Sequence, residues 1–554
     1  MIEKYLIRKN FKSYEDFKEN YKLNVPKDFN FAYDVVDGWA KIDKNKQALL
    51  RVDDTGTETA YTFSDMKRLS DKCANAFLSL DIKKGDVVML MLKQRVEVWI
   101  SILALHKIGA IVIPATFQLM PKDIVYRCNA ASVKMIVCVD DNELLDNIIT
   151  VMPECKTLKR VGIVGQNTRN LIDFKELISL SPEGFTRPEG VKAPKLTDTM
   201  LIYFSSGTTG MPKMVVHDYT YPLGHITTAA FWQETQDNTR HLTMSDSGWA
   251  KFGWGKIYGQ WICGATIVAY DTEKFVPVKL LEIISRLGLT TFCAPPTIYR
   301  FLIKENLKAY DFSTIKKACT AGEPLNPEVY ERFLEATGLE ICEGFGQSES
   351  SVMLANYPYK PKRAGSIGLP SPLYDIDIVD ENGVSCEDGI VGNIVVKNLD
   401  KNYPAGLFKK YLNDVHANAA AFKNNMYNTG DTAWRDSEGY FYFVGRSDDI
   451  IKCSGYRIGP FEVESALLTH KSVLECAVTA APDEIRGQVV KATVVLAKCY
   501  TASEALKKEL QEHVKKTTAP YKYPRIIEFV TELPKTISGK IKRGEIRKED
   551  EVKG

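Results

Sequence analysis

Residues 86–139, DVVMLMLKQRVEVWISILALHKIGAIVIPATFQLMPKDIVYRCNAASVKMIVCV, alternate between strand-like and helix-like stretches. Short continuous apolar runs predict strands, and longer amphipathic segments predict helices. The predicted strands cover 87–92, 111–114 and 133–139, and the predicted helices cover 96–105 and 120–131. Strands that alternate with helices at this spacing are typical of βαβ units, in which helices cover both faces of a parallel sheet. The stretch therefore predicts an α/β fold.

The same alternation returns later, and the chain changes character after Tyr440. A helix at 279–287, a strand at 290–294 and a helix at 297–308 are predicted first. Beyond Tyr440 we predict strands at 441–444, 474–480, 489–497 and 526–530 and helices at 460–468 and 502–516. Thr501 and Glu504 have the spacing of a capping box for the last of these helices. We therefore expect a large N-terminal domain of βαβ-type sheets, residues 1–446, and a smaller α+β domain, residues 447–554.

Composition narrows the class of protein. The 554 residues are 45% hydrophobic and 26% charged, which is typical of a globular protein, and the length favours more than one domain. With 72 basic against 70 acidic residues, the net charge of +2 gives no bulk attraction to nucleic acid or to an anionic membrane. We expect no nucleic-acid partner, and the oligomeric state stays open.

Cysteine usage and apolar patterning bear on location. The 12 cysteines are scattered singly without a C-x-x-C pair, so reduced thiols in the cytoplasm are the simplest interpretation. The first 17 residues mix acids with bases and resemble neither a secretory signal nor an acid-poor transit peptide. The most apolar region, 96–115, is interrupted by charged residues and glycine, so no membrane span is expected.

The loop in YFSSGTTGMPK, residues 203–213, combines hydroxyls, glycines and a lysine. Glycines let backbone N–H groups approach an anion closely, so the loop has the makings of a phosphate cradle. A polar surface turn is the alternative. The spacing differs from G-x-x-x-x-G-K-[ST], and apolar residues on both flanks predict strand, loop, strand instead of a strand and a helix.

Five further stretches stand in order with this loop. They are TAGEPLN (320–326), EGFGQSES (343–350), YNTGD (427–431), GRSDDIIKCSGYR (445–457) and PKTISGKIKR (534–543). Together the six resemble the core motifs of the AMP-forming adenylating superfamily, which includes acyl-CoA synthetases, luciferases and amino-acid adenylation domains. The resemblance implies that a carboxylic acid attacks the α-phosphate of Mg-ATP, giving acyl-AMP and pyrophosphate, and that a thiol such as coenzyme A (CoA) then displaces AMP.

The resemblance also assigns roles to residues. The β- and γ-phosphates would be held by Ser205, Ser206, Gly207, Thr208, Thr209, Gly210 and Lys213. The rest of the nucleotide site would comprise Gly322, Glu323, Pro324, Glu343, Gly344, Phe345, Gln347, Ser348, Asp431 and Arg446. Of these, Asp431 would accept both ribose hydroxyls, and Ser348 stands where most members have Thr. Glu349 would bind Mg²⁺. A turn-forming Asp431 and a surface Glu349 are the alternatives.

The C-terminal motifs imply a moving domain. Lys540 would be the catalytic lysine, whose ammonium lies between the attacking carboxylate and the α-phosphate. Its neighbours Lys535, Lys542 and Arg543 are expected to face water. Asp448 matches the hinge of the family. The segment that would face the CoA pantetheine consists of Ser454, Gly455, Tyr456 and Arg457.

The resemblance places the acid near Trp249, Ala250, Ala321 and Gly346, with Phe231 and Trp232 as possible pocket walls. Acetate-specific members carry Trp at the position of Gly346, so an open pocket is expected here. This, with SDSGWA at 245–250, looks most like the short- to medium-chain acyl-CoA synthetases.

Other functions stay open. They are an aryl-acid or acetate CoA ligase, an amino-acid adenylating enzyme with Asp246 binding the ammonium group, and a non-catalytic nucleotide sensor. The presence of Lys540, Glu349 and Asp431 argues against the sensor.

Overall fold

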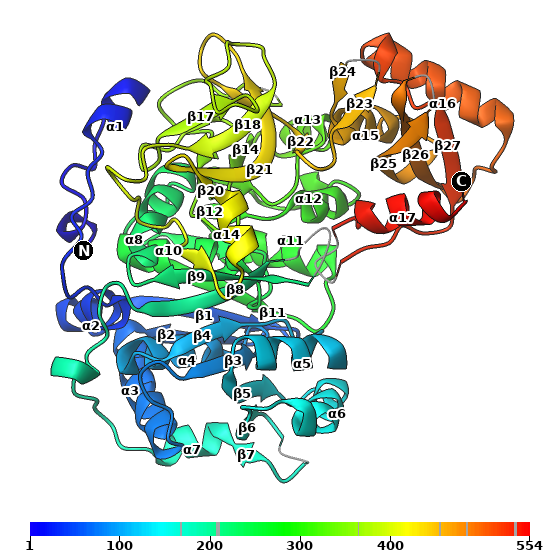
Figure 1. Cartoon of the computed structure of the whole chain (residues 1–554). Coiled ribbons are helices and arrows are strands. Elements are labelled where there is room, and N and C mark those ends of the chain that lie inside the picture. The colour runs from blue at the N-terminus through cyan, green and yellow to red at the C-terminus, as the bar shows by residue number, and fades with distance from the viewer. Residues whose placement is uncertain are drawn as a thin grey trace.

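The computed structural model describes residues 1–166, 169–205, 211–363, 365–453, 456–483, 486–536 and 540–553. Sheets and helices of the N-terminal part fill most of Figure 1, and a smaller unit, coloured orange to red, lies at the upper right. The predicted class, a large α/β part followed by a smaller α+β part, is confirmed. None of the helices in the described ranges is long and apolar enough to cross a membrane.

The stretch at 86–139 forms the centre of one sheet. Its strands, in sheet order, are β19 (Lys410–Tyr411), β9 (Lys213–Asp218), β8 (Thr199–Ser205), β4 (Ile111–Pro114), β3 (Val87–Met91), β5 (Val133–Val139), β6 (Arg160–Val164) and β7 (Ile172–Asp173). β3 pairs in parallel with β4 and β5, and every residue of β3 is buried. The predicted pair of strands around 206–212 is confirmed as the antiparallel pair β8 and β9.

Helices cover this sheet as predicted. They are α3 (Phe63–Ser79), α4 (Val96–Ile108), α5 (Pro121–Ala130), α6 (Asn142–Val151) and α7 (Phe174–Leu180). α4 runs beyond the predicted end at residue 105, to Ile108, where Gly109 adopts a φ of 80°. A left-handed residue at this position is a common helix end, and glycine adopts it without strain.

A second sheet carries two of the nucleotide motifs. Its order is β16 (Leu369–Pro370), β15 (Leu354–Ala355), β14 (Ile341–Phe345), β13 (Lys317–Thr320), β12 (Thr291–Cys293), β10 (Arg240–Thr243), β11 (Thr266–Asp271), β1 (Gln47–Asp53) and β2 (Glu58–Thr62). Its helices include α11 (Pro277–Arg286), α12 (Pro296–Leu302), η6 (Leu307–Ala309) and α13 (Pro327–Thr337). The helix predicted at 297–308 is therefore wrong in its second half, because the polar run at 304–306 interrupts the apolar period.

The remaining helices connect these layers or precede them. They are η1 (Ile2–Lys4), α1 (Tyr14–Asn20), η2 (Ala32–Val36), α2 (Asp37–Ile42), η3 (Met152–Glu154), η4 (Gly190–Lys192), α8 (Tyr221–Ile226), η5 (Thr227–Trp232), α9 (Ala250–Gly255), α10 (Tyr258–Cys263) and α14 (Val415–Ala421). η2 and η5 are π-helices, a rare form that is frequent at functional sites.

Between β22 and β23 the chain passes from a third sheet to a fourth. The third contains β17 (Ile376–Val379), β18 (Gly392–Val396), β21 (Met426–Arg435), β20 (Phe422–Lys423) and β22 (Phe441–Arg446). The fourth contains β24 (Tyr456–Ile458), β23 (Ile451–Cys453), β26 (Gly487–Leu496), β25 (Val473–Asp483) and β27 (Ile526–Val530). Its helices are α15 (Pro460–Leu468), α16 (Glu504–Thr517), η7 (Pro520–Lys522) and α17 (Arg543–Lys553).

Two predictions for this last part are wrong. α16 begins at Glu504, so Ser503 is its N-cap and accepts a hydrogen bond from Leu506 N at 3.1 Å in place of a Thr501 capping box. Arg543 does not face water freely. It makes two 2.8 Å contacts with the buried carboxylate of Glu464, because α17 packs under the fourth sheet (Figure 1).

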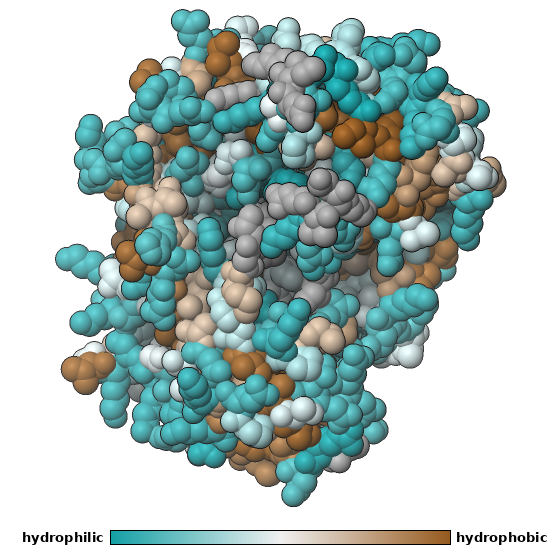
Figure 2. All heavy atoms as spheres, turned by 45° about the vertical axis from the view of Figure 1, so that its right-hand side comes forward, coloured by the Kyte–Doolittle hydropathy of each residue, from teal (hydrophilic) through white to brown (hydrophobic). Residues whose placement is uncertain are grey.

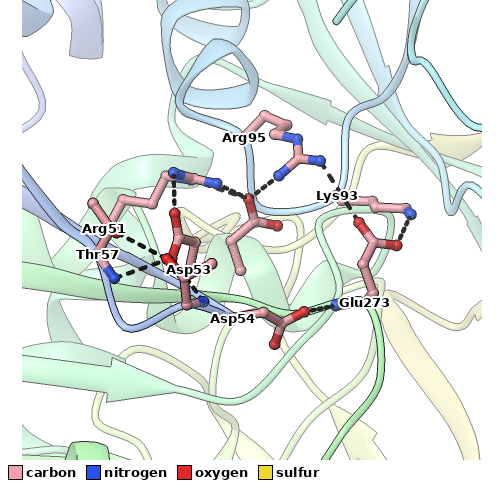
Figure 3. Close-up of polar contacts among 9 residues, drawn as sticks. Arg51, Asp53, Asp54, Thr57, Lys93, Arg95 and Glu273 are labelled. Carbon is pink, nitrogen blue, oxygen red and sulfur yellow. Dashed lines mark hydrogen bonds and ion pairs between the residues drawn. The ribbon is translucent and has the colours of Figure 1, made fainter.

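A buried carboxylate, Asp271, ties the end of β11 to β1 and to the loop before α4. Arg51 contacts Asp271 at 2.5 Å and 3.0 Å, and Arg95 contacts it at 2.5 Å. Figure 3 shows both arginines with Lys93 and Glu273, which pair at 2.6 Å. Gln94, in the same loop, donates to Ser245 O at 2.9 Å. The network therefore fixes the loop that contacts Ser245, at the start of the 245–250 stretch.

We expect Asp271→Asn to destabilise the protein. The side chain is 2% exposed and its loss of charge leaves two arginines without their shared partner. Removing one member of such a buried group costs about 3 to 5 kcal/mol. The midpoint of thermal unfolding measures the effect. Glu273→Gln is the matched control, because that carboxylate is 61% exposed and its pair contributes less than about 1 kcal/mol. Equal midpoints for the two variants would contradict the role of Asp271.

Candidate active site

Motifs far apart in the sequence meet where β13 and β14 end. These strands pair in parallel, and each runs directly into a motif, at 321–324 and at 346–350. The carboxyl ends of parallel strands are where α/β folds bind ligands. Figure 2 turns the C-terminal part toward the viewer and shows a hollow near the middle of that face, where hydrophilic residues are prominent among the described ones.

Asp431 is held by two neighbours. Gln347 donates from Nε2 to Asp431 Oδ2 at 2.5 Å and to Thr429 O at 2.8 Å. Arg446 stands opposite Asp431 in the β21–β22 pairing, with Nη1 at 3.4 Å from Oδ1. Burial raises the pKa of Asp431 to about 6, although Arg446 and Gln347 act in the opposite direction. The arrangement presents a fixed, buried carboxylate that can accept two hydroxyl groups.

Glu349 is a buried carboxylate beside the end of the phosphate loop. Tyr411 donates its hydroxyl to Glu349 Oε1 at 2.9 Å, and the Lys213 ammonium lies 4.9 Å from the centre of the Tyr411 ring. Burial raises the pKa of Glu349, so the carboxyl lacks enough positive charge around it to favour ionisation fully. A divalent cation would supply that charge.

Mg²⁺ fits this site only with help from other ligands. In the described part of the chain no three His, Cys, Asp or Glu side chains stand together as a metal site. Mg²⁺ is commonly held by one or two carboxylates, substrate phosphates and water. Glu349 therefore suits a cation that arrives with a nucleotide.

His217 and Tyr411, which the sequence did not single out, support the residues that follow β14. His217 of β9 makes a 2.7 Å hydrogen bond through Nε2 to Ser348 O, and since a carbonyl only accepts, Nε2 carries the proton. Burial lowers the pKa of His217 to about 3, so the ring is neutral. β9 also pairs with β19, which carries Tyr411. β9 thus supports Ser348 through His217, and it supports Tyr411, the partner of Glu349, through its pairing with β19.

The predicted adenine-side residues lie along β13, β14 and the turn after β13. Gly322 has a φ of 104°, which requires glycine in that turn. Glu343 is buried and accepts from Leu325 N at 3.4 Å, and burial raises its pKa to about 7. Glu323 is turned toward α12, where it accepts from Thr297 Oγ1 at 3.1 Å. Phe345 packs 6.1 Å from Phe443, between two sheets.

Two ammonium groups share the site. Lys251 of α9, which the sequence did not single out, donates from Nζ to Ala321 O. Burial lowers the pKa of Lys251, and the charge of Lys540 lowers it further. Lys540 also lowers the pKa of Asp431. Neither lysine is ion-paired with a carboxylate among the residues that the structure describes, so both charges are available to an anionic ligand.

The space next to Gly346 is not open, contrary to expectation. A Cβ at this position would lie 2.4 Å from Cη2 of Trp254 and 2.7 Å from Ser351 O. Trp254 is buried and fixed by a 3.1 Å hydrogen bond from Nε1 to Ser350 O. An aromatic wall therefore exists here, but a residue of α9 supplies it, and a local motif at 343–350 does not reveal it.

The other residues predicted to lie near the carboxylic acid differ in their positions. Trp232 lies against Gly344 and 6.2 Å from Trp254, next to the proposed acid site. Trp249 and Ala250 begin α9 and are partly exposed. Phe231 packs instead on Phe17 of the N-terminal segment at 4.7 Å, which argues against a role as a pocket wall.

Asp246 does not suit an ammonium group. It accepts from Gly248 N at 2.7 Å, and burial raises its pKa, which favours the neutral form. The nearby Lys256 and Lys93 already supply positive charge to it. The amino-acid adenylating alternative therefore loses its one candidate carboxylate.

Some predicted residues lie outside the described residues. They are Ser206, Gly207, Thr208, Thr209, Gly210, Ser454 and Gly455, together with the side chain of Arg457. At the two ends of the loop predicted to bind phosphate, Ser205 and Lys213 are register partners, and the predicted strands on both flanks are confirmed. Tyr456 is 51% exposed and stacks on Tyr521 with ring centres 4.2 Å apart.

Comparison with known proteins gives concordant matches. Two family models fit the chain, "AMP-binding enzyme" over residues 36–412 and "AMP-binding enzyme C-terminal domain" over residues 462–540. The mitochondrial acyl-coenzyme A synthetase ACSM3 of Mus musculus is 41% identical over 98% of this chain and 94% of its own length. Two solved structures are also similar. The anthranilate CoA ligase AuaEII in complex with anthranoyl-AMP has a TM-score of 0.85 at 28% identity, covering 96% of this chain and 98% of its own. The Brucella canis acyl-CoA synthetase has a TM-score of 0.71 at 30% identity and 95% coverage of both chains.

Proposed function

This chain belongs to the AMP-binding enzyme family, and we propose that it joins a short- to medium-chain fatty acid to CoA. It is an AMP-forming acyl-CoA synthetase that uses ATP, Mg²⁺ and CoA. The acid carboxylate attacks the α-phosphorus of ATP, the bond to the β-phosphate oxygen breaks, and pyrophosphate leaves. The CoA thiol then attacks the acyl carbon, loses its proton and expels AMP.

The observation that best supports these roles is that Lys540 is near enough to Lys251 and to Asp431 to lower the pKa of each. Negative charge develops on the α-phosphate oxygens during the first step, and a fixed ammonium stabilises it. Lys540 would supply that charge from the C-terminal part, and Lys251 would face the acid from α9. Glu349 would hold Mg²⁺ with the phosphates, and this cation would neutralise charge on the departing pyrophosphate. Asp431 would hold the ribose.

We propose that the acid lies between α9 and the end of β14. Trp254 lies against Gly346 and 6.2 Å from Trp232 in this region, and such aromatic surroundings suit an apolar chain of limited length. The proposed domain boundary follows Arg446, with Asp448 as the hinge, and the segment 454–457 would face the CoA arm after domain rotation. Arg446 Nε lies 3.6 Å from the Asp448 carboxylate, so rotation at the hinge would alter this contact.

The substrate class is tested by AMP formation with straight-chain, branched and aromatic acids, with and without CoA. We expect CoA-dependent turnover to be highest with straight-chain acids of short to medium length. An aryl acid is the second candidate, because the anthranilate CoA ligase is structurally similar and tryptophans line the region. Preference for benzoate-type acids would replace the fatty-acid proposal, and a wild type confined to acetate would overturn it.

Location is a separate proposal. We propose a reducing compartment, with the cytoplasm favoured, because the 12 cysteines are scattered singly along the sequence without a C-x-x-C pair and 11 of them are buried. The similar Mus musculus synthetase is named as mitochondrial, and the matrix is also reducing. Imaging of a fluorescently tagged chain against a mitochondrial marker separates the two.

The raised pKa of Asp431 predicts how ATP use depends on pH. A carboxyl whose pKa is raised to about 6 is mostly neutral below that pH and then accepts ribose hydroxyls poorly. We therefore expect kcat/KM for ATP to fall about tenfold per pH unit below 6 and to level off above it. Asp431→Asn should have low activity that no longer falls below pH 6. Glu343→Gln is the control and should show the same fall in kcat/KM below pH 6. If the fall disappeared in Glu343→Gln and remained in Asp431→Asn, it would be assigned to Glu343.

A further inference from the structure

Asp449, the residue after the proposed hinge, is a buried carboxylate in a turn. Its side chain is 4% exposed, and its backbone N–H donates to Arg446 O at 3.0 Å. The same turn includes Ser447, whose N–H donates to Gly430 O at 2.9 Å, next to Asp431. On its N-terminal side, Asp449 is therefore connected through this turn to the proposed ribose site.

On its other side, Asp449 is bound by α17. Arg547 Nη1 lies 2.5 Å from Asp449 Oδ1, and Arg543 Nη1 lies 3.8 Å from Oδ2. Arg543 is itself fixed to Glu464 of α15. Two arginines one helical turn apart thus hold the turn after the hinge against the first half of α17.

Lys540 lies three residues before α17, and hydrogen bonds join the segment 540–542 to residues 534–536. Lys540 N donates to Thr536 Oγ1 at 3.1 Å, Thr536 N donates to Lys540 O at 2.7 Å, and Lys542 N donates to Pro534 O at 2.9 Å. Lys542 O also accepts from Glu545 N at 3.0 Å and from Ile546 N at 3.4 Å, so the segment 540–542 is joined to the start of α17. The orientation of α17 therefore sets where the Lys540 ammonium points.

We propose that Asp449 and Arg547 form a positioning pair that fixes the Lys540 segment relative to the hinge. The pair makes rotation at Asp448 carry Lys540 into and out of the site as one rigid unit. This inference rests on the proposed function, in which Lys540 acts in acyl-AMP formation only. Neither side chain needs to touch substrate, so both act through Lys540.

The pair is not needed simply to attach α17. Ile546 is 4% exposed and packs with Ala477, Val495 and Leu533. At the far end of the helix, Asp550 pairs with Lys491. With these contacts and the Arg543–Glu464 pair intact, a variant at Arg547 should fold with α17 in place but with a looser Lys540 segment.

The test measures the two half-reactions of the full-length enzyme separately. Arg547→Met keeps the aliphatic stem and removes the charge, Arg547→Lys restores a charge, and Lys548→Met is the matched control because Lys548 is an exposed neighbour on the same helix. Acyl-AMP formation is followed by ATP–pyrophosphate exchange, and the second step by CoA transfer from supplied acyl-AMP. Amide hydrogen exchange of residues 540–546 reports on the segment itself.

We expect Arg547→Met to lower the rate of ATP–pyrophosphate exchange by about tenfold or more, since small displacements of a catalytic group have effects of this size. CoA transfer should change less than about threefold, and Arg547→Lys should recover part of the lost acyl-AMP formation. The amide hydrogens of residues 540–546 should exchange with solvent faster than in wild type. Equal loss in both half-reactions, or unchanged adenylation, would overturn the positioning role. Failure of the proposed function is distinguishable, because wild type and Lys548→Met would then lack exchange activity too.

Discussion

Replacement of Lys540 by alanine is expected to lower acyl-AMP formation by about a hundredfold or more while CoA transfer from supplied acyl-AMP is nearly unchanged. One preorganised charge contact to a transition state contributes on the order of 3 kcal/mol, which corresponds to that factor. Lys540 is suited to this role because, within the described ranges, no carboxylate pairs with it. Its charge reaches Asp431 and Lys251 instead.

The neighbouring lysine provides the control. Lys542 pairs with Glu545 at 2.8 Å on the surface, so Lys542→Ala should keep both half-reactions within about twofold of wild type. ATP–pyrophosphate exchange and single-turnover CoA transfer are the measurements. If Lys540→Ala reduced both steps equally, the separation of roles between the two domain orientations would be wrong.

The sequence predicted strands and helices well where the apolar period was unbroken. All five elements predicted within 86–139 are present, because buried strands and the helices over them have little freedom in register. The predicted helix ends were wrong where neighbouring polar residues could serve the same role. Ser503 and Thr501 can both cap a helix, and only the true start of α16 decides between them.

The candidate site was less predictable, because its geometry depends on long-range pairing. Tyr411 reaches Glu349 only because β19 pairs with β9, almost two hundred residues earlier in the chain. Lys251 looks like any lysine at the start of a helix, and its partial burial follows from its hydrogen bond to Ala321 O in the turn after β13. Short motifs indicate the residue types of a site and leave its supporting contacts undetermined.

Gly346 illustrates this limit and leads to the second large effect. From the sequence alone, Gly346→Trp should fill an open pocket and favour acetate. In the structure the site over Gly346 is already occupied by the Trp254 indole on one side and by the Ser351 carbonyl on the other. We therefore expect Gly346→Trp to lower kcat/KM by about a hundredfold or more for every acid, acetate included, because overpacking displaces the loop that leads to Glu349.

A double variant separates overpacking from a general intolerance of position 346. Trp254→Gly in the Gly346→Trp background moves the indole from α9 to the loop, which removes the 2.4 Å contact and leaves only the 2.7 Å approach to Ser351 O. We expect this variant to regain activity with short acids only, since each methylene excluded from an apolar pocket costs about 0.8 kcal/mol. Profiles of kcat/KM against chain length, from acetate upward, compare the three proteins. A single Gly346→Trp variant that stayed active on acetate would show that the Trp254 ring can swing aside, and the pocket would then be as adaptable as the sequence implied.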